Sequence, residues 1–152
     1  MFDKNTALEK FDDFLLVMDD QLEALENDAE SRGIDLDFSV SSLEKLEQLF
    51  TVMAEGVHKD IINQLIVYFA RYLGEIVRTN YGGKWHLSLD DPKNVNFNTP
   101  VIVGHTSIED LEFAPIGIMR AFAIKRRSGM LWTAINADIN PSPLDLSGLV
   151  EE

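Results

Sequence analysis

The hydrophobic period changes once along this chain, at Gly82-Gly83, and no other feature constrains the fold as strongly. Before the glycine pair, apolar residues recur at three- and four-residue steps, the spacing of one face of an α-helix. After it, Trp85 and Leu87 alternate with polar residues, as in a half-buried strand. The sequence therefore predicts an α+β fold, in which N-terminal helices pack on a small, mainly antiparallel sheet and a further helix follows towards the C-terminus.

Three helices are expected before the change of period. The first is predicted over about residues 5–32. The second should begin with a capping box, in which Ser41 and Glu44 each satisfy the backbone N–H of the other, and end near Gly56. The third spans roughly 58–80 and is apolar over about half its circumference. This breadth predicts a central helix that is contacted from two directions.

Two or three short strands are expected after the change, from the alternation in 84–89 and 95–98 and the apolar run 101–103. A helix should begin at Pro115, because proline is favoured at the first helical position. Residues 131–136 are expected to form a last strand.

The length of 152 residues is typical of one domain, predicted here with a helical part at about 5–80, a sheet-containing part at about 84–136 and a loosely held tail at 137–152. The chain has no cysteine, which excludes disulfides and thiolate metal sites. It shows no basic N-terminus leading into an apolar run, and no apolar stretch long enough to span a bilayer. The expected location is therefore the cytoplasm, without membrane association.

Acidic residues outnumber basic ones by 26 to 13, giving a formal net charge of −13. A field of this sign repels nucleic acid and anionic membranes, and it would speed encounter with a basic protein partner. The alternative is that the acidity only keeps the protein in solution.

No motif for a metal or a cofactor is present. The three histidines, His58, His86 and His105, are far apart in sequence, whereas zinc ligands come at tight spacings. Gly82-Gly83 follows a helix and precedes a strand, which is the reverse of a phosphate-binding loop. The basic run 125–127 fits the C-terminal end of a helix, where cations complement the helix dipole. We therefore expect no metal, no cofactor and no catalytic residue set.

Two polar groups have a structural and a functional interpretation. His86, Ser88 and Asp90 share one face of the predicted strand, either as an acid–base pair with a hydroxyl between them or simply as its solvent face. Four aspartates of the first helix form either a carboxylate cluster or, as the missing Glu-x-x-His pattern favours, a solvated face. They are Asp12, Asp13, Asp19 and Asp20.

Gly74 and Glu75 interrupt the longest apolar helix. Glycine inside a helix costs about 0.5–1 kcal/mol relative to alanine, so Gly74 predicts that another segment crosses closely there. Glu75 has Arg71 four residues before it and Arg78 three after, which predicts a ladder of surface ion pairs. The alternative is that Glu75 belongs to a functional site.

Two segments carry a resemblance. Tyr72-Leu73-Gly74-Glu75 is followed by Gly82-Gly83-Lys84-Trp85, and Phe113-Ala114-Pro115 begins a helix that leads to Arg127-Ser128-Gly129. With this arrangement, the chain over roughly 60–135 resembles a group of small bacterial α+β domains of unknown function. The resemblance implies the same layout of helices and strands, and it implies no activity.

The sequence favours a non-enzymatic protein-binding module, such as an inhibitor or immunity-type protein that neutralises a basic partner. The candidate binding residues are Glu75, Trp85, His86 and His105. The alternative is a small enzyme whose site is assembled from scattered residues, with Glu75, His86 and His105 as its members. A subunit that forms a homo-oligomer is a third class.

Overall fold

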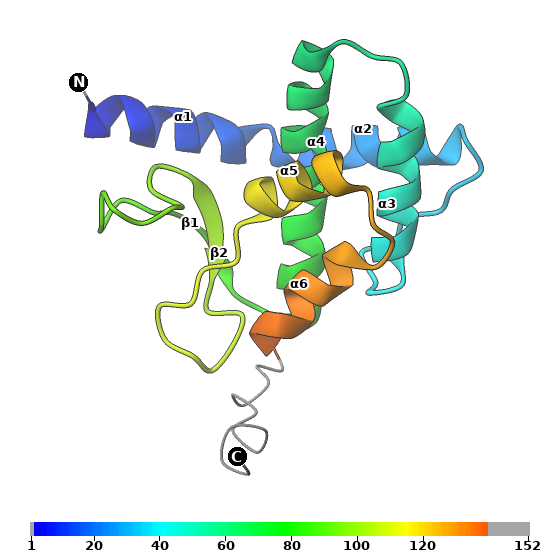
Figure 1. Cartoon of the computed structure of the whole chain (residues 1–152). Helices are drawn as coiled ribbons and strands as arrows, with labels where there is room; N and C mark the ends of the chain where they lie inside the picture. Colours follow the sequence, from blue (N-terminus) through cyan, green and yellow to red (C-terminus); the bar gives the residue numbers. More distant parts are fainter. Residues whose placement is uncertain (1, 140–152) are drawn as a thin grey trace, which may run out of the picture.

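The computed structural model describes residues 2–139 of the chain. Within this range it has six helices and one two-stranded sheet, which confirms the predicted α+β fold (Figure 1). The elements in chain order are α1 (Lys4–Leu16), α2 (Met18–Glu30), α3 (Ser42–Met53), α4 (Lys59–Tyr81), β1 (Lys84–Leu87), β2 (Pro100–Val103), α5 (Pro115–Lys125) and α6 (Met130–Ile139).

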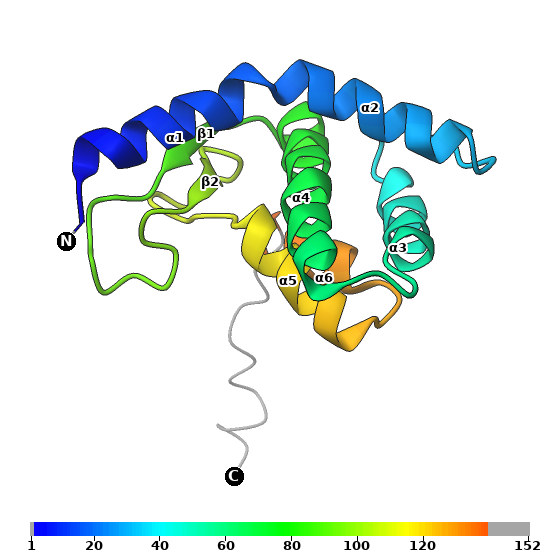
Figure 2. The ribbon, with the colours of Figure 1, turned by 90° about the horizontal axis from the view of Figure 1, so that it is seen from above.

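The central element is α4, which packs against α2, α3, α5 and β2. Its apolar side chains Phe69, Leu73 and Ile76 are completely buried. Figure 2 shows α2 and α3 beside α4 on one side and α5 on the other. The predicted contact of this helix from more than one direction is therefore confirmed.

The first predicted helix is two helices. Val17 adopts φ −92° and ψ 7°, outside the helical region, so α1 ends and α2 begins around it. Backbone hydrogen bonds still run from Val17 N–H to Asp13 and from Gln21 N–H to Val17. The pair consequently forms one long, bent arm across the molecule, with the hairpin beside α1 and α3 beside α2 (Figures 1 and 2). The predicted stop at Gly33 fits its positive φ of 73°.

The predicted capping box at α3 is wrong. Ser41 is the N-cap residue but its side chain makes no capping hydrogen bond. The neighbouring Ser42 hydroxyl donates to the Asp37 carboxylate and accepts from the Asp37 N–H, so the turn before α3 closes on Asp37. Hydrogen bonds from the hydroxyls of Ser39 and Ser42 lower the pKa of Asp37 to about 2.

The sheet is one antiparallel hairpin, in which Lys84 pairs with Val103 and Leu87 with Pro100. A single bridge between Ile102 and Phe113 extends it. The strand predicted at 95–98 is wrong, because these residues lie in turns with short-range bonds such as Phe97 N–H to the Asn94 carbonyl. Their alternation has no apolar face to bury: Val95 is 94% exposed.

The helix predicted at Pro115 is confirmed as α5, but the strand predicted at 131–136 is helix α6. The Glu47 carboxylate accepts from the backbone N–H groups of Gly129 and Leu131, and so caps the start of α6. Leu131 and Ile135, four residues apart, are both buried, which is helical spacing. The tail predicted from 137 also begins too early, since α6 runs to Ile139; its remainder lies outside the described residues.

Among residues 2–139, no helix is long and apolar enough to cross a membrane.

Candidate functional site

Trp85 explains the glycine in α4. A Cβ added to Gly74 would lie 2.2 Å from Cζ2 of the indole, so no larger residue fits without a shift. The close crossing predicted at Gly74 is therefore confirmed, and the crossing segment is β1. The other side of Trp85 packs edge-on against Phe14 of α1, with 5.0 Å between ring centroids. Trp85 thus lies between α4 and α1 and fixes both.

Glu75 is not part of a surface ladder with two arginines. Its carboxylate accepts from Trp85 Nε1 at 2.7 Å and from Arg78 Nη1 at 2.8 and 2.9 Å, and its side chain is 16% exposed. Arg71 instead donates from Nε to the Phe14 carbonyl. The pairing with Arg78 was predicted correctly and the pairing with Arg71 was not. Glu75 and Trp85 thus hold the hairpin on α4.

His105 follows β2 and is buried. Its Nε2 lies 2.9 Å from Oδ2 of Asp138 in α6, and its ring meets the edge of Phe113. The other ring nitrogen, Nδ1, is buried and has no hydrogen-bond partner within residues 2–139. His105 therefore connects the segment after the hairpin to the end of α6.

His86 lines a separate polar cavity of about 540 Å³ between the hairpin and the segments 88–94 and 110–112. Glu112, in the cavity wall, accepts hydrogen bonds from the Ser88 hydroxyl and from the side-chain amides of Asn94 and Asn96. Burial acts to raise the pKa of Glu112, but these three donors outweigh it and the pKa is lowered. The remaining lining residues are Lys84, Asp90, Asp91, Val103 and Asp110.

The cavity does bring His86, Ser88 and Asp90 together, as their shared face predicted. The Ser88 hydroxyl nevertheless donates to Glu112. A carboxylate with a lowered pKa is a poor base, so this contact does not activate the hydroxyl as a nucleophile. The geometry favours a polar recess over a catalytic pair.

The candidate residues do not form one site. Glu75 and Trp85 touch each other, whereas the cavity at His86 is lined by neither Glu75 nor His105. Within residues 2–139, no group of three or more His, Cys, Asp or Glu side chains is placed to hold a metal ion. His58 lies apart at the start of α4, where its ring accepts from the Asp60 N–H.

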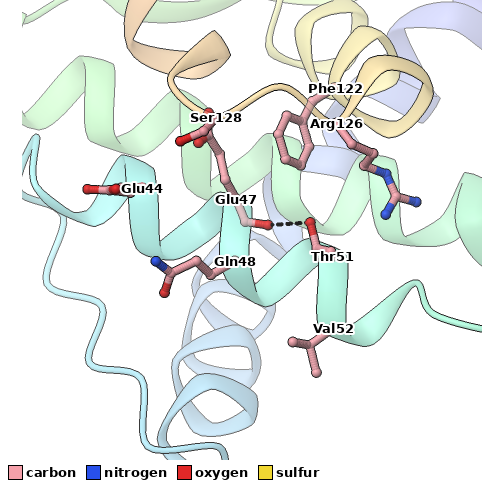
Figure 3. Close-up of a pocket in the computed structure, with 8 residues that line it drawn as sticks. All are labelled: Glu44, Glu47, Gln48, Thr51, Val52, Phe122, Arg126 and Ser128. Carbon is pink, nitrogen blue, oxygen red and sulfur yellow. Dashed lines mark hydrogen bonds between the residues drawn. The ribbon is translucent and has the colours of Figure 1, made fainter.

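A groove of about 330 Å³ lies between α3 and the α5–α6 connection (Figure 3). Phe122 lines it from α5, Arg126 from the position just after α5, and Glu47 and Thr51 from α3. The Glu47 carboxylate is occupied by the start of α6, so this buried acid supports the fold. Local sequence gave no signal for this groove, because its two walls are about 80 residues apart.

A larger groove of about 660 Å³ lies beside α1, against the hairpin, α4 and the start of α5. Sequence reasoning missed it as well. Most of its wall is apolar, but two basic side chains, Lys10 and Arg71, line it. The other lining residues are Ala7, Phe11, Asp13, Phe14, Val17, Val67, Leu87, Asn98, Pro100 and Ile116.

The opposite face of the arm is acidic. Residues 1–39 contain twelve acidic and three basic side chains, out of 26 and 13 in the whole chain. Six of the acidic residues are exposed and lie on the side of α1 and α2 away from the buried side chains. We call this the acidic stripe: Glu9, Asp12, Asp19, Asp20, Glu23 and Glu30.

No protein-family model, curated protein or solved structure matches this chain. The resemblance to small bacterial domains therefore stays a prediction. Three residues of the motifs that carry it have a physical role in this fold, since Gly74, Glu75 and Trp85 form the contact that joins α4 to the hairpin.

Proposed function

We propose that this chain is a protein-binding module whose acidic stripe docks onto a basic protein. The observation that carries the proposal is the concentration of charge on one continuous face of α1 and α2. Like charges on one surface repel one another, so a solvated stripe of this length costs stability unless it serves a contact. A basic partner would relieve that repulsion and be drawn to this face first.

The exposure of Leu16 is a second observation in favour of docking at this face. Leu16 lies between Asp12 and Asp19 at the junction of α1 and α2, and it is 82% exposed. A single exposed leucine is ordinary on a protein surface. Here it would place one apolar contact at the centre of a charged rim, which is the arrangement of many protein interfaces. The partner that fits is a basic surface with a shallow apolar recess, as in an inhibitor of a basic protein.

The test is affinity purification from the native host with two matched variants. In the first, three stripe residues are neutralised, by Asp12→Asn, Asp19→Asn and Glu23→Gln. The control removes the same charge from exposed residues elsewhere, by Glu55→Gln, Asp60→Asn and Glu109→Gln. None of the three stripe residues makes a hydrogen bond or ion pair within residues 2–139, so the first variant should fold normally.

We expect one stoichiometric basic partner, bound by the wild type and by the control variant but lost with the stripe variant. Association should also slow markedly as salt is added, because charge steers the encounter. A partner that binds the two variants equally, or at a rate independent of salt, would contradict the proposal. Self-association alone would favour the homo-oligomer, and a co-purified substrate-like molecule at the His86 cavity would favour the enzyme.

A further inference from the structure

We propose that the groove beside α1 is a binding site for a small amphipathic carboxylate, such as a medium-chain fatty acid. This site is independent of the acidic stripe, because it lies on the inner side of α1 and carries the opposite charge. Its volume of about 660 Å³ is in the range of small-molecule sites. Three observations determine the class of ligand: an unpaired arginine, an apolar wall and the distribution of charge at the rim.

Arg71 is the first observation. It is only partly exposed, and burial lowers its pKa, although an arginine side chain remains protonated at neutral pH. Its guanidinium lies 4.3 Å from the centroid of the Phe14 ring, and its Nε donates to the Phe14 carbonyl. Within residues 2–139 no carboxylate lies within ion-pair distance of it.

This isolation is unexpected in a chain with twice as many acidic as basic residues. A partly buried charge loses hydration and needs a compensating partner. The contacts to Phe14 use one of the five N–H donors of the guanidinium. The Nη donors remain for a bidentate contact, and a carboxylate matches their spacing.

The wall of the groove is the second observation. Val67, Leu87 and Ile116 come from α4, β1 and α5, and they line the groove together with the side chains of Phe11 and Phe14 from α1. These residues bring an apolar surface and a partly buried cation, Arg71, into one groove. An alkyl chain would cover the apolar wall, and its carboxylate would reach Arg71. A fully polar anion such as phosphate would leave the apolar wall exposed to water.

The rim is the third observation. Lys10 adds a second positive charge, which also has no ion-pair partner within residues 2–139. Asp13 is the single acidic side chain in the lining, and it is exposed. The groove is therefore a local positive region in an acidic protein, and Asp13 limits its affinity for an anion.

The test is a calorimetric titration of the full chain with decanoate below its micelle concentration, with decanol as the uncharged probe. We expect saturable binding of one decanoate per chain and much weaker binding of decanol. Arg71→Met should weaken decanoate binding roughly tenfold or more, because it removes a charge-assisted hydrogen bond. The matched control is Arg120→Met, which removes an exposed arginine of α5 outside the groove and should leave binding unchanged.

A second variant, Asp13→Asn, tests the same site if Arg71→Met folds poorly. Asp13 is exposed, so we expect this variant to fold normally. Removal of its charge should tighten decanoate binding by roughly two- to threefold. In the wild type, decanoate should shift the NMR signals of the Val67, Leu87 and Ile116 methyl groups. Equal binding of decanol, no effect of Asp13→Asn, shifts confined to other residues, or no saturable binding would each overturn the proposal.

Discussion

The two halves of the N-terminal arm have the same length but differ in charge and in how they are held. Each of α1 and α2 has 13 residues. Helix α2 buries Leu22, Leu25 and Ala29 against the core, whereas α1 buries only Ala7 and Phe14. An acidic outer face is therefore compatible with a firmly packed helix and with a lightly packed one.

Two tyrosines of α4 strengthen the contrast. The Tyr72 hydroxyl donates to the Glu26 carboxylate and accepts from the Phe38 N–H, and the Tyr68 hydroxyl donates to Asp28. Burial and these carboxylates raise the pKa of both tyrosines. Both sets of contacts reach α2 or the segment after it. Helix α1 is held mainly at Phe14, which packs against Arg71 and Trp85, and the groove lies beside this contact. We infer that α2 is firmly held by the core, whereas α1 is lightly held and is the helix that borders the groove.

Truncation of the core residue Leu25 should have the largest effect. Leu25 is completely buried, so Leu25→Ala should lower the free energy of unfolding by about 2–5 kcal/mol. The matched change in α1, Leu8→Ala, removes a leucine that is 38% exposed and should cost less than about 0.5 kcal/mol. Denaturant titration of both variants measures the difference. Equal losses would show that the two helices are held alike.

Gly74→Leu tests the contact between Trp85 and Phe14 that holds α1. The new side chain must displace Trp85, and overpacking of this kind typically costs about 1–3 kcal/mol. Because Trp85 also supports Phe14, the variant should loosen α1 more than α2. Denaturant titration gives the stability change, and amide chemical shifts show which helix moves. A neutral variant would mean that Trp85 can rotate away and that Gly74 is not needed for packing.

Tyr72→Phe removes one anchor of α2 and keeps the packed ring. We expect a loss of about 1 kcal/mol, the net value of a typical hydrogen bond, since both Glu26 and the Phe38 N–H lose a partner. Thermal and denaturant unfolding provide the measurement. No loss at all would indicate that water replaces the hydroxyl and that packing alone holds α2.

The smallest expected effect concerns the turn between α2 and α3. The folded pKa of Asp37, about 2, is below its ordinary value, so the hydrogen bonds that lower it stabilise the fold above about pH 4. This contribution is lost as the pH falls through about 2. An NMR titration of the Asp37 carboxyl group should show the low midpoint, and Ser42→Ala should raise it. An unshifted midpoint in the variant would assign the effect to other groups.

Local patterns predicted the elements whose signals are local. The apolar face of α4, the proline that begins α5 and the glycine pair before β1 were all visible in the sequence. Even the close crossing at Gly74 was predicted, though its partner Trp85 was not named. Each of these features depends on residues within a few turns of one another.

Two of the failures share a physical cause, which is a partner distant in sequence. Helix α6 was mistaken for a strand because the carboxylate that caps it belongs to Glu47, over 80 residues earlier. The capping box failed for a local reason, because the Ser41 hydroxyl pairs with the Ser39 hydroxyl, which in turn donates to Asp37. The groove beside α1 is lined by five elements, α1, α4, β1, β2 and α5, so the sequence alone did not indicate that Arg71 lies in an apolar groove.

Native-state hydrogen exchange tests most directly whether α1 opens independently of α2. The amides of Phe14 and Leu15 in α1 should exchange through a local opening that is cheaper than global unfolding. Those of Leu25 and Glu26 in α2 should exchange only with global unfolding, because α2 is packed and hydrogen-bonded to α4. Equal protection of the two helices would contradict this division of the arm into a firmly held half and a lightly held half.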